Sequence, residues 1–313
     1  MKRNSCYLVV AALTAASLSF QSCDFFKKSG AGVDSTDVAN VALAGDSLEF
    51  CTVLYEDTLT VGESLIQQSI KVDFPIPEAE GVLADSIREY LEQAIIQRRF
   101  PQFGEEVAED ESFFYEKGEE QAFVNTCASA GMSHMVASVN SAAEEGWNAN
   151  FENDYNASMA YQTGKFVTFD ESYSIYTGGA HGLYISWGTT FRKSDGKKMG
   201  WEIFDMSKKE QLIALIKREL RSYFAFQPEN DPISEEELME QLQVFDDPDT
   251  PENELEFGIP LPKYAPSVTR EGIAFVYQQY EIAAYACGLP SGIFSIEQVK
   301  ELLSDEGREL LGL

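Results

Sequence analysis

One of the two histidines in the chain lies where its neighbours could support chemistry. Residues 173–184 read YSIYTGGAHGLY, so that Gly178 and Gly179 come just before His181. Histidine titrates near neutral pH and glycine lets a substrate approach the backbone, so His181 with a nearby carboxylate could be the acid or base of a hydrolase. Alternatively, the glycines form a turn or bulge and His181 hydrogen-bonds across it. No GxSxG nucleophile motif occurs, which favours the structural interpretation.

Other polar groups fit a catalytic or metal site less well. Asp170, Glu171 and Glu281 could form a carboxylate pair that cleaves glycosides, but acids are abundant enough for coincidence to explain them. His134 lacks an HExxH partner, which argues against a zinc hydrolase. The acidic segment 246–254 lacks the central glycine of an EF-hand loop. The sequence therefore predicts no metal and no cofactor, and favours a protein that is not an enzyme.

Aromatic residues near His181 indicate a binding surface instead. Aromatic side chains stack on sugars and peptides, but in an alternating strand they more often belong to the core. The face that carries Tyr176 and Tyr184 is the best candidate for an outward-facing site. The predicted ligand-binding residues are Tyr176, Gly178, Gly179, His181, Tyr184, Tyr280 and Glu281.

A hairpin and two helices are expected before this stretch. Segments 47–55 and 64–77 alternate between polar and apolar residues, which predicts an antiparallel hairpin with one apolar face. Its apolar positions in the second segment are Ile66, Ile70, Val72 and Phe74. A helix over 82–98 would cover that face with Val82, Leu83, Ile87, Leu91 and Ile95. A second helix is predicted over 117–145, with Gly131 as a soft point.

The second half of the chain returns to strands. Segments 155–161, 166–177, 183–192 and 197–204 predict a four-stranded meander, whose last turn is the hairpin pair Asp195-Gly196. Capping boxes at Ser207–Glu210, Ser234–Glu237 and Ser295–Gln298 predict three helix starts. Residues 245–266 are acidic and rich in proline, which predicts a loop, and residues 272–285 predict a further strand.

These elements predict an α+β fold with antiparallel sheets, an N-terminal hairpin and a C-terminal meander, each covered by helices. The expected organisation is a lipoprotein signal peptide over 1–22 and a flexible tether over 23–44. An N-terminal α+β part over 45–148 and a C-terminal α+β domain over 149–313 would follow.

The first residues predict export and a lipid anchor. Lys2 and Arg3 precede an apolar run over 7–18, and a small residue stands just before Cys23. This pattern resembles the lipobox of bacterial lipoproteins, in which Cys23 would carry the lipid; an ordinary secretory signal is the alternative. We expect a monomer anchored in the bacterial envelope, on the outer membrane and facing the periplasm or the surface.

Net charge limits the class of binding partner, and the cysteine spacing limits the kinds of metal or disulfide site. The formal charge of −29 makes nucleic acid an unsuitable partner and would attract cationic proteins, although an acidic surface also serves solubility. Cys51, Cys127 and Cys287 show no CxxC spacing, so they predict neither a zinc site nor a disulfide framework, and at most one bridge among them. We expect them mainly as small buried residues.

Several segments in order resemble a known family. The strand ending in YTGGAHG, the Asp-Gly turn and the closing GIAFVYQQYEIAAYACG resemble the extracellular domain of the anti-sigma factor RsiV. The same domain family accompanies the catalytic domain of the peptidoglycan deacetylase PdaC, whose metal-binding motifs have no counterpart here. RsiV's domain binds lysozyme. The resemblance implies an envelope binding or sensor-like module for a cationic protein such as lysozyme or for a peptidoglycan fragment, and it carries over no catalytic residue.

Overall fold

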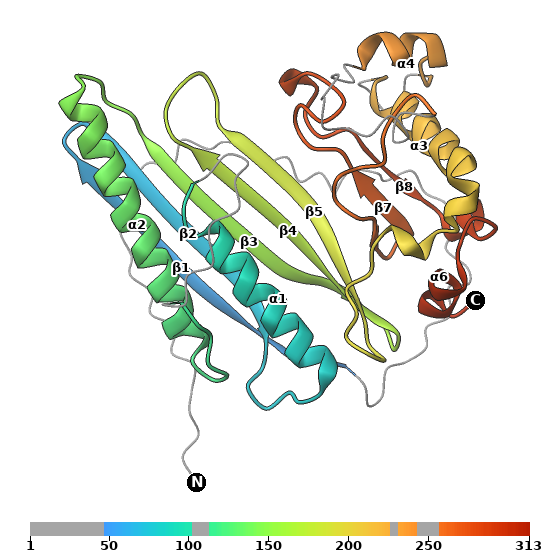
Figure 1. Ribbon diagram of the computed structural model, residues 1–313, viewed down its shortest axis with the longest axis horizontal. Helices are drawn as coiled ribbons and strands as arrows, with labels where there is room; N and C mark the ends of the chain where they lie inside the picture. The colour runs from blue at the N-terminus through green and yellow to red at the C-terminus, as the bar shows by residue number, and fades with distance from the viewer. Residues whose placement is uncertain (1–46, 102–112, 226–230, 243–256) are drawn as a thin grey trace. The chain divides into compact units, whose positions relative to one another are not determined.

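The computed structural model describes residues 47–101, 113–225, 231–242 and 257–313. Within these ranges the chain has a mixed α+β fold with a five-stranded sheet, a three-stranded antiparallel sheet and six α-helices (Figure 1). The predicted lipid site at Cys23, the tether and the acidic segment 246–254 lie outside them. No helix in the described ranges is long and apolar enough to cross a membrane.

The predicted N-terminal hairpin is confirmed. Strand β1 (Phe50–Val61) pairs with β2 (Ser64–Pro75) in antiparallel register, and β1 continues six residues beyond its predicted end. The four predicted apolar positions of β2 are fully buried. Burial at every second residue is what a strand with one covered face requires.

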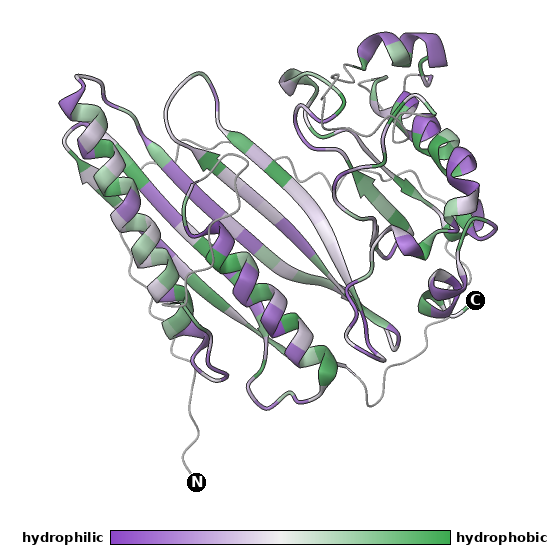
Figure 2. Cartoon of the chain, in the orientation of Figure 1, coloured by the Kyte–Doolittle hydropathy of each residue, from purple (hydrophilic) through white to green (hydrophobic). Residues whose placement is uncertain are grey.

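Helix α1 (Val82–Arg98) has the predicted bounds and covers this face together with α2 (Glu120–Glu144) (Figure 1). Ile87, Leu91 and Ile95 are fully buried, whereas Val82 is 54% exposed. Leu83 is partly buried and packs against the core, so the apolar side of α1 begins one residue later than predicted. Figure 2 shows the alternation of hydrophobic and hydrophilic residues along α1.

Gly131 in the middle of α2, where the sequence predicts a soft point, is a packing position. A Cβ atom at residue 131 would lie 1.9 Å from the carbonyl oxygen of Arg99. Only a residue without a side chain allows the backbone just after α1 to come this close to α2. Gly131 is buried within α2, and the absence of a side chain lets α2 approach the end of α1.

The hairpin and the C-terminal strands form one sheet, which corrects the prediction of two. Strands β3 (Phe151–Gln162), β4 (Phe166–Tyr176) and β5 (Leu183–Arg192) are antiparallel neighbours, and β3 also pairs with β2 in parallel. The strand order is β1-β2-β3-β4-β5. A parallel neighbour requires a long crossover connection, and α1 and α2 lie in that connection.

The fourth strand predicted over 197–204 is wrong. Only an isolated bridge joins Phe191 to Lys198, and Trp201–Ile203 is a 3-10 turn. Ile203 and Phe204 are both buried, and two consecutive residues of a strand cannot face the same core.

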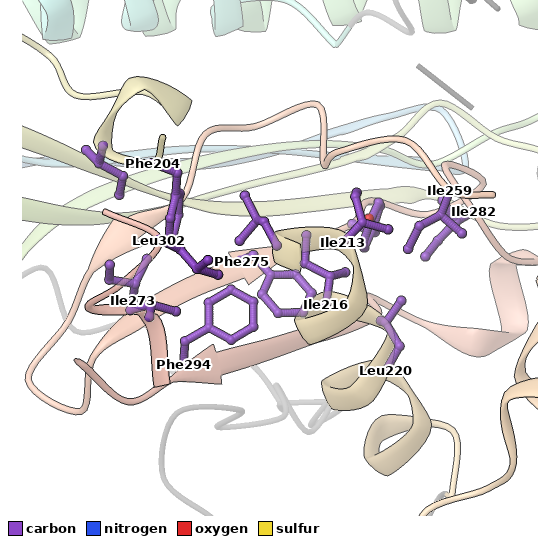
Figure 3. Close-up of a cluster of buried hydrophobic side chains, with 14 of the residues drawn as sticks. Phe204, Ile213, Ile216, Leu220, Ile259, Ile273, Phe275, Ile282, Phe294 and Leu302 are labelled. Carbon is purple, nitrogen blue, oxygen red and sulfur yellow. The ribbon is translucent and has the colours of Figure 1, made fainter. Parts of the chain in front are cut away.

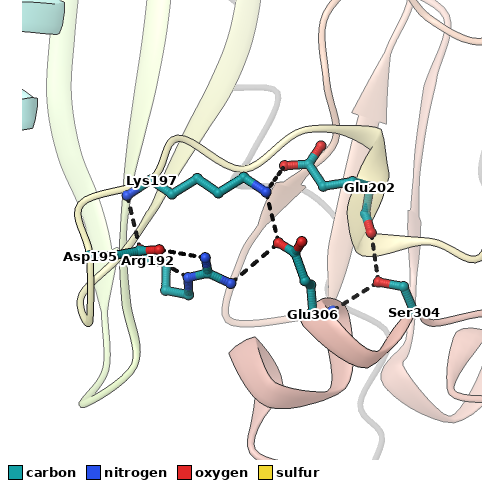
Figure 4. A network of polar contacts seen from close by, with 7 residues as sticks. Arg192, Asp195, Lys197, Glu202, Ser304 and Glu306 are labelled. Carbon is teal, nitrogen blue, oxygen red and sulfur yellow. Dashed lines mark hydrogen bonds and ion pairs between the residues drawn. The ribbon is translucent and has the colours of Figure 1, made fainter.

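The turn after β5 is longer than the predicted two-residue turn. The amide nitrogen of Arg192 donates to the carbonyl of Lys197, and Gly196 alone has a positive φ within this turn. Arg192 pairs with Asp195 and Glu306, and Lys197 pairs with Glu306 as well (Figure 4). The side chain of Arg192 lowers the pKa of Asp195 to about 2. These ion pairs attach the turn to the start of the last helix.

Two of the three predicted capping boxes are confirmed, at Ser234 before α4 (Glu235–Gln241) and at Ser295 before α5 (Ile296–Val299). The box predicted at Ser207 is wrong. Asp205 accepts from the backbone N–H of Ser207 and caps the 3-10 turn that leads into α3 (Lys209–Tyr223).

The C-terminal part contains the three-stranded sheet β6 (Ser267–Val268), β7 (Ile273–Val276) and β8 (Ser291–Phe294). Helix α3 packs against β8, and α6 (Asp305–Leu311) packs near the turn at Trp201–Ile203. Figure 3 shows the apolar core between these elements. Its labelled members are Phe204, Ile213, Ile216, Leu220, Ile259, Ile273, Phe275, Ile282, Phe294 and Leu302.

The strand predicted over 272–285 ends at Val276, and the rest of that prediction is wrong. After β7, the side-chain nitrogen of Gln278 donates to the carbonyl of Ser186, and the side-chain oxygen of Gln278 accepts from the backbone N–H of Ser186. A single side chain thus satisfies the outer edge of β5 as a neighbouring strand would. Tyr280, with φ of 66°, turns the chain away.

The three cysteines of the described part lie against apolar clusters. Cys127 is fully buried, and burial raises the pKa of its thiol to about 12. Cys51 and Cys287 are partly buried beside the two largest clusters. These positions agree with the expectation of small packing residues.

Candidate functional site

The face of the five-stranded sheet opposite α1 and α2 carries polar side chains. Successive residues of a strand point to opposite faces, so the residues between the buried positions of β2, β3 and β4 lie on this second face, called here the polar face. One row across it consists of Glu56, Ser69, Asp154, Ser174 and Tyr184. The next row consists of Thr58, Gln67, Glu152 and Tyr176. Two predicted ligand-binding residues, Tyr176 and Tyr184, therefore share rows with carboxylates.

Asp154 lies at the centre of the first row and is half-buried. Burial raises its pKa, and the charges of Glu152 and Glu56 raise it further, to about 6. All three effects disfavour the ionised form. Near neutral pH this part of the polar face therefore holds negative charge at a cost in free energy, and a cation placed against it would reduce that cost.

On the helix-covered face, Glu171 is 1% exposed. The hydroxyl of Tyr90 donates to its Oε1 at 2.6 Å, and the hydroxyl of Tyr155 donates to its Oε2 at 2.7 Å. The hydroxyl of Thr189 also donates to Oε1. Burial and the nearby carboxylate raise the pKa of Tyr155 well above its usual value, so this phenol keeps the proton that it donates. Glu171 is thus a buried carboxyl group with satisfied oxygens.

Arg98 at the end of α1 supplies the matching positive charge. Its guanidinium lies 4.7 Å from the ring centroid of Trp187 and 5.1 Å from that of Tyr155. Burial opposes the charge of Arg98, whereas Tyr155 and Glu171 favour it, and its pKa is raised overall. Arg98 and Glu171 are therefore opposite charges close enough for Glu171 to favour the charged form of Arg98.

The loop between β4 and β5 contains the two predicted glycines. Gly178 and Gly179 have φ angles of 87° and 97°, a region that favours glycine. The hydroxyl of Tyr176 donates to the carbonyl of Gly179 at 3.0 Å. The glycines thus form the loop that carries His181, as the structural interpretation expects.

His181 is exposed and has hydrogen bonds on both ring nitrogens. Nδ1 lies 2.9 Å from the carbonyl oxygen of Gly182, and Nε2 lies 3.0 Å from the hydroxyl of Tyr280. Because a carbonyl can only accept, Nδ1 carries the proton of the neutral ring, and Nε2 then accepts from Tyr280. The ring also stacks on Tyr285 at 3.9 Å. In the described part, the side-chain partners of His181 are thus two tyrosines and not a carboxylate.

Tyr184 and Tyr280 are the most exposed aromatic residues of the predicted set, at 44% and 47%. The amide nitrogen of Tyr184 donates to the side chain of Gln279, which precedes Tyr280 in the chain. His181 and Tyr280 contact each other, and Tyr184 follows His181 by three residues, so these exposed side chains belong to one region at the start of β5. It is called here the aromatic end.

Glu281 has a different surrounding. Its carboxylate accepts from the backbone N–H groups of Lys263 and Gln278, and burial raises its pKa. Asp170 and Glu171 are consecutive in β4 and so point to opposite faces. The described contacts bring no two of these three acids together as a catalytic pair.

No cluster of three or more potential metal ligands occurs in the described ranges. His134 lies in α2, with its ring centroid 4.8 Å from that of Phe100. This position gives it an aromatic partner from the segment just after α1.

Sequence reasoning did not single out Glu56, Glu152 and Asp154. A signal exists, because the buried residues Phe151, Asn153 and Tyr155 alternate with polar ones in a strand. That pattern places Glu152 and Asp154 on one face, but it does not show that β1 brings Glu56 near them. The register across three strands is needed for that.

Comparisons with known proteins find a family model that matches part of the chain, and solved structures with a similar fold. Residues 202–296 match the family model described as "Protein of unknown function (DUF3298)". None of the curated proteins matches the chain.

Two solved structures share the fold. A member of the DUF3298 family from Bacteroides fragilis NCTC 9343 is 17% identical, with a TM-score of 0.64, over 85% of this chain and 96% of that one. A DUF3298 family protein from Pseudomonas aeruginosa PAO1 is 12% identical, with a TM-score of 0.52, over 83% of this chain and 96% of that one. At these identities the likeness shows the fold alone.

Proposed function

We propose that this chain is a non-catalytic binding module of the bacterial cell envelope, held by lipid on Cys23, whose polar face binds a cationic protein such as lysozyme. The observation that carries the proposal is the grouping of Glu56, Glu152 and Asp154 on the polar face, where the row on the other side of Asp154 contributes one cation, Lys71. The pKa of Asp154, about 6, results from burial and from two further carboxylates, with no opposing cation among the causes. A lysine or arginine from a partner would relieve this repulsion.

The aromatic end gives the same surface a second means of recognition. Tyr184 lies in the row of Asp154, the loop between β4 and β5 supplies His181, and the segment after β7 supplies Tyr280. Protein interfaces concentrate binding energy in aromatic residues, while charges mainly control the rate of association and the choice of partner. The resemblance to the RsiV domain supports a lysozyme-like partner, and the net charge of −29 favours a cationic one.

The test is a titration of the full chain with lysozyme at low and moderate salt. We expect saturable binding that weakens as salt rises, because exposed charges are screened over about 10 Å at 0.1 M salt. Lysozyme with acetylated lysines is the matched ligand, since it keeps the fold and loses positive charge. Absence of binding at low salt would remove the lysozyme version of the proposal.

A triple variant locates the surface. Glu56→Gln, Glu152→Gln and Asp154→Asn together should weaken binding by roughly tenfold and reduce its salt dependence. The matched control removes three charges elsewhere: Glu297→Gln, Glu301→Gln and Asp305→Asn. An equal loss in both triple variants would mean that net charge alone attracts lysozyme and that the polar face is not a specific site.

Peptidoglycan fragments are the other candidate ligand, and a cell-wall hydrolase is the alternative function. Both are tested by incubating the chain with such fragments and analysing the products. Cleavage that disappears in His181→Ala would replace the proposal with a hydrolase that uses His181. Binding without cleavage would leave a recognition module with a different ligand.

A further inference from the structure

A pocket with a volume of about 330 Å³ lies between α1, β5 and the segment at Tyr264. It is on the helix-covered side of the sheet, because α1 contributes Tyr90 and Arg98 and β5 contributes Trp187. The volume is at the lower end of the range of small-molecule sites, about 300 to 1,000 Å³. One six-membered ring with its substituents fits such a space.

The wall of the pocket is aromatic and held in place. Trp187 stacks on Tyr264 with ring centroids 4.9 Å apart and an interplanar angle of 16°. Tyr90 is fixed by its hydrogen bond to Glu171, and the indole N–H of Trp187 points to the Tyr90 hydroxyl at 3.4 Å. Side chains fixed in this way lose little conformational entropy when a ligand binds.

The charged residues that line the pocket are both cations, Arg98 and Lys198. The chain has 52 acidic and 23 basic residues, so a lining with two cations and no acid runs against its composition. Glu171 lies behind Tyr90 and Thr189 and is not part of the lining. The pocket thus offers positive charge to a ligand even though the protein as a whole is acidic.

Both cations have donors to offer. Lys198 is exposed, its Nζ lies 5.0 Å from the ring centroid of Tyr90, and no carboxylate in the described ranges forms an ion pair with it. Arg98 donates from Nη1 to the carbonyl of Ala94 and also interacts with the hydroxyl of Tyr264, and its guanidinium has five N–H groups, so further donors remain beside the pocket. Gln93, also exposed, adds an amide at the same wall.

We propose that this pocket binds a small molecule that combines a ring with a single carboxylate. The ring packs against the aromatic wall of Tyr90, Trp187 and Tyr264, and the carboxylate pairs with Lys198 and Arg98. Acidic sugars and aromatic acids share this chemistry. The site lies on the opposite side of the sheet from the polar face, so it does not depend on the binding of a cationic protein.

The experiment is a calorimetric titration of the full chain with three probes. N-acetylmuramic acid has a sugar ring and a carboxylate, N-acetylglucosamine has the corresponding ring without the carboxylate, and 4-hydroxyphenylacetate has an aromatic ring and a carboxylate. We expect at least one acid to bind and N-acetylglucosamine to bind at least roughly fivefold more weakly. The tighter of the two acids identifies the source of the ligand.

A matched pair of variants connects binding to the pocket. Lys198→Ala should weaken the acid roughly fivefold, whereas Lys197→Ala should change it less than twofold, because Lys197 pairs with Glu306 outside the pocket. Both lysines are at the surface, so neither change endangers folding. The proposal is overturned if neither acid binds, if the neutral sugar binds as tightly as its acid, or if the two variants have equal effects.

Discussion

Glu171 and Asp154 lie on neighbouring strands of the same sheet, but on opposite faces. Glu171 is buried, accepts hydrogen bonds from three hydroxyl groups and lies in the field of Arg98. Asp154 is half-buried, and the charges that act on it are those of Glu56 and Glu152. The more deeply buried acid is thus the better compensated one.

This difference separates a structural role from a candidate functional one. A buried charge persists in a fold only where partners offset the loss of water, and Glu171 has those partners within the chain. A half-buried charge beside other charges of the same sign, such as Asp154, lowers the stability of the fold. A cationic ligand bound there would reduce this loss, which makes the residue a candidate functional one. The comparison therefore directs the search for a partner to the polar face.

The largest expected effect is a loss of stability when Glu171 is replaced. Glu171→Ala would leave three buried hydroxyl groups without their acceptor and would remove the negative charge that favours the charged form of Arg98. Unsatisfied buried groups together with a lost opposite charge cost about 3 to 5 kcal/mol. Urea unfolding monitored by circular dichroism measures the loss. Glu171→Gln keeps one acceptor oxygen and should lose less. A loss below about 1 kcal/mol for Glu171→Ala would mean that Glu171 is not essential to the interior.

The second largest expected effect is a gain of stability when Asp154 is replaced. The pKa of Asp154 is raised from 3.8 to about 6, so between these values the folded protein binds more protons than the unfolded chain. Its free energy of unfolding therefore falls as pH rises through this window. Each pKa unit corresponds to about 1.4 kcal/mol, so the full shift is worth about 3 kcal/mol. Solvent screens part of this at a half-buried group, so Asp154→Asn should stabilise the protein by about 2 kcal/mol near pH 7.5.

Measuring the stability of Asp154→Asn at a lower pH provides an internal control. Near pH 3.5 Asp154 is largely protonated in both states, so Asp154→Asn and the unchanged protein should have nearly equal stability. Asp57→Asn, on the exposed edge strand β1, removes the same charge from a position outside the rows of the polar face. A gain of similar size in Asp57→Asn, or one that persists at pH 3.5, would contradict the assignment to Asp154.

Local patterns in the sequence were enough for the elements that carry one clear period. The bounds of α1 and the pairing of β1 with β2 follow from the spacing of apolar residues. The same reasoning failed over 197–204 and 277–285, where the alternation does not reflect a strand. Ile203 and Phe204 enter the C-terminal core from a 3-10 turn, and Gln278 uses its side chain to complete the edge of β5.

The candidate site was only partly predictable for a related reason. The sequence marks Tyr176 and Tyr184 as one face, and the loop glycines as a turn. It also places Glu171 among the inward positions of β4, which is a signal for a buried acid. Its partners come from α1, β3 and β5, and no local pattern predicts which of those elements meet at one point.

The smallest expected effect compares one hydroxyl on each face. Thr189 donates to Glu171 inside the fold, and Ser174 lies 3.4 Å from Glu152 on the polar face. A buried hydrogen bond to a charged group contributes about 1.5 to 3 kcal/mol, so Thr189→Val should lower the free energy of unfolding by at least about 1 kcal/mol. Ser174→Ala should change it by less than about 0.5 kcal/mol, because water replaces a long bond at a half-exposed site. Equal losses in urea unfolding would show that hydroxyl groups stabilise Glu152 as much as Glu171. The carboxylates of the polar face would then be stabilised within the chain, and the comparison would no longer point to an absent cationic partner.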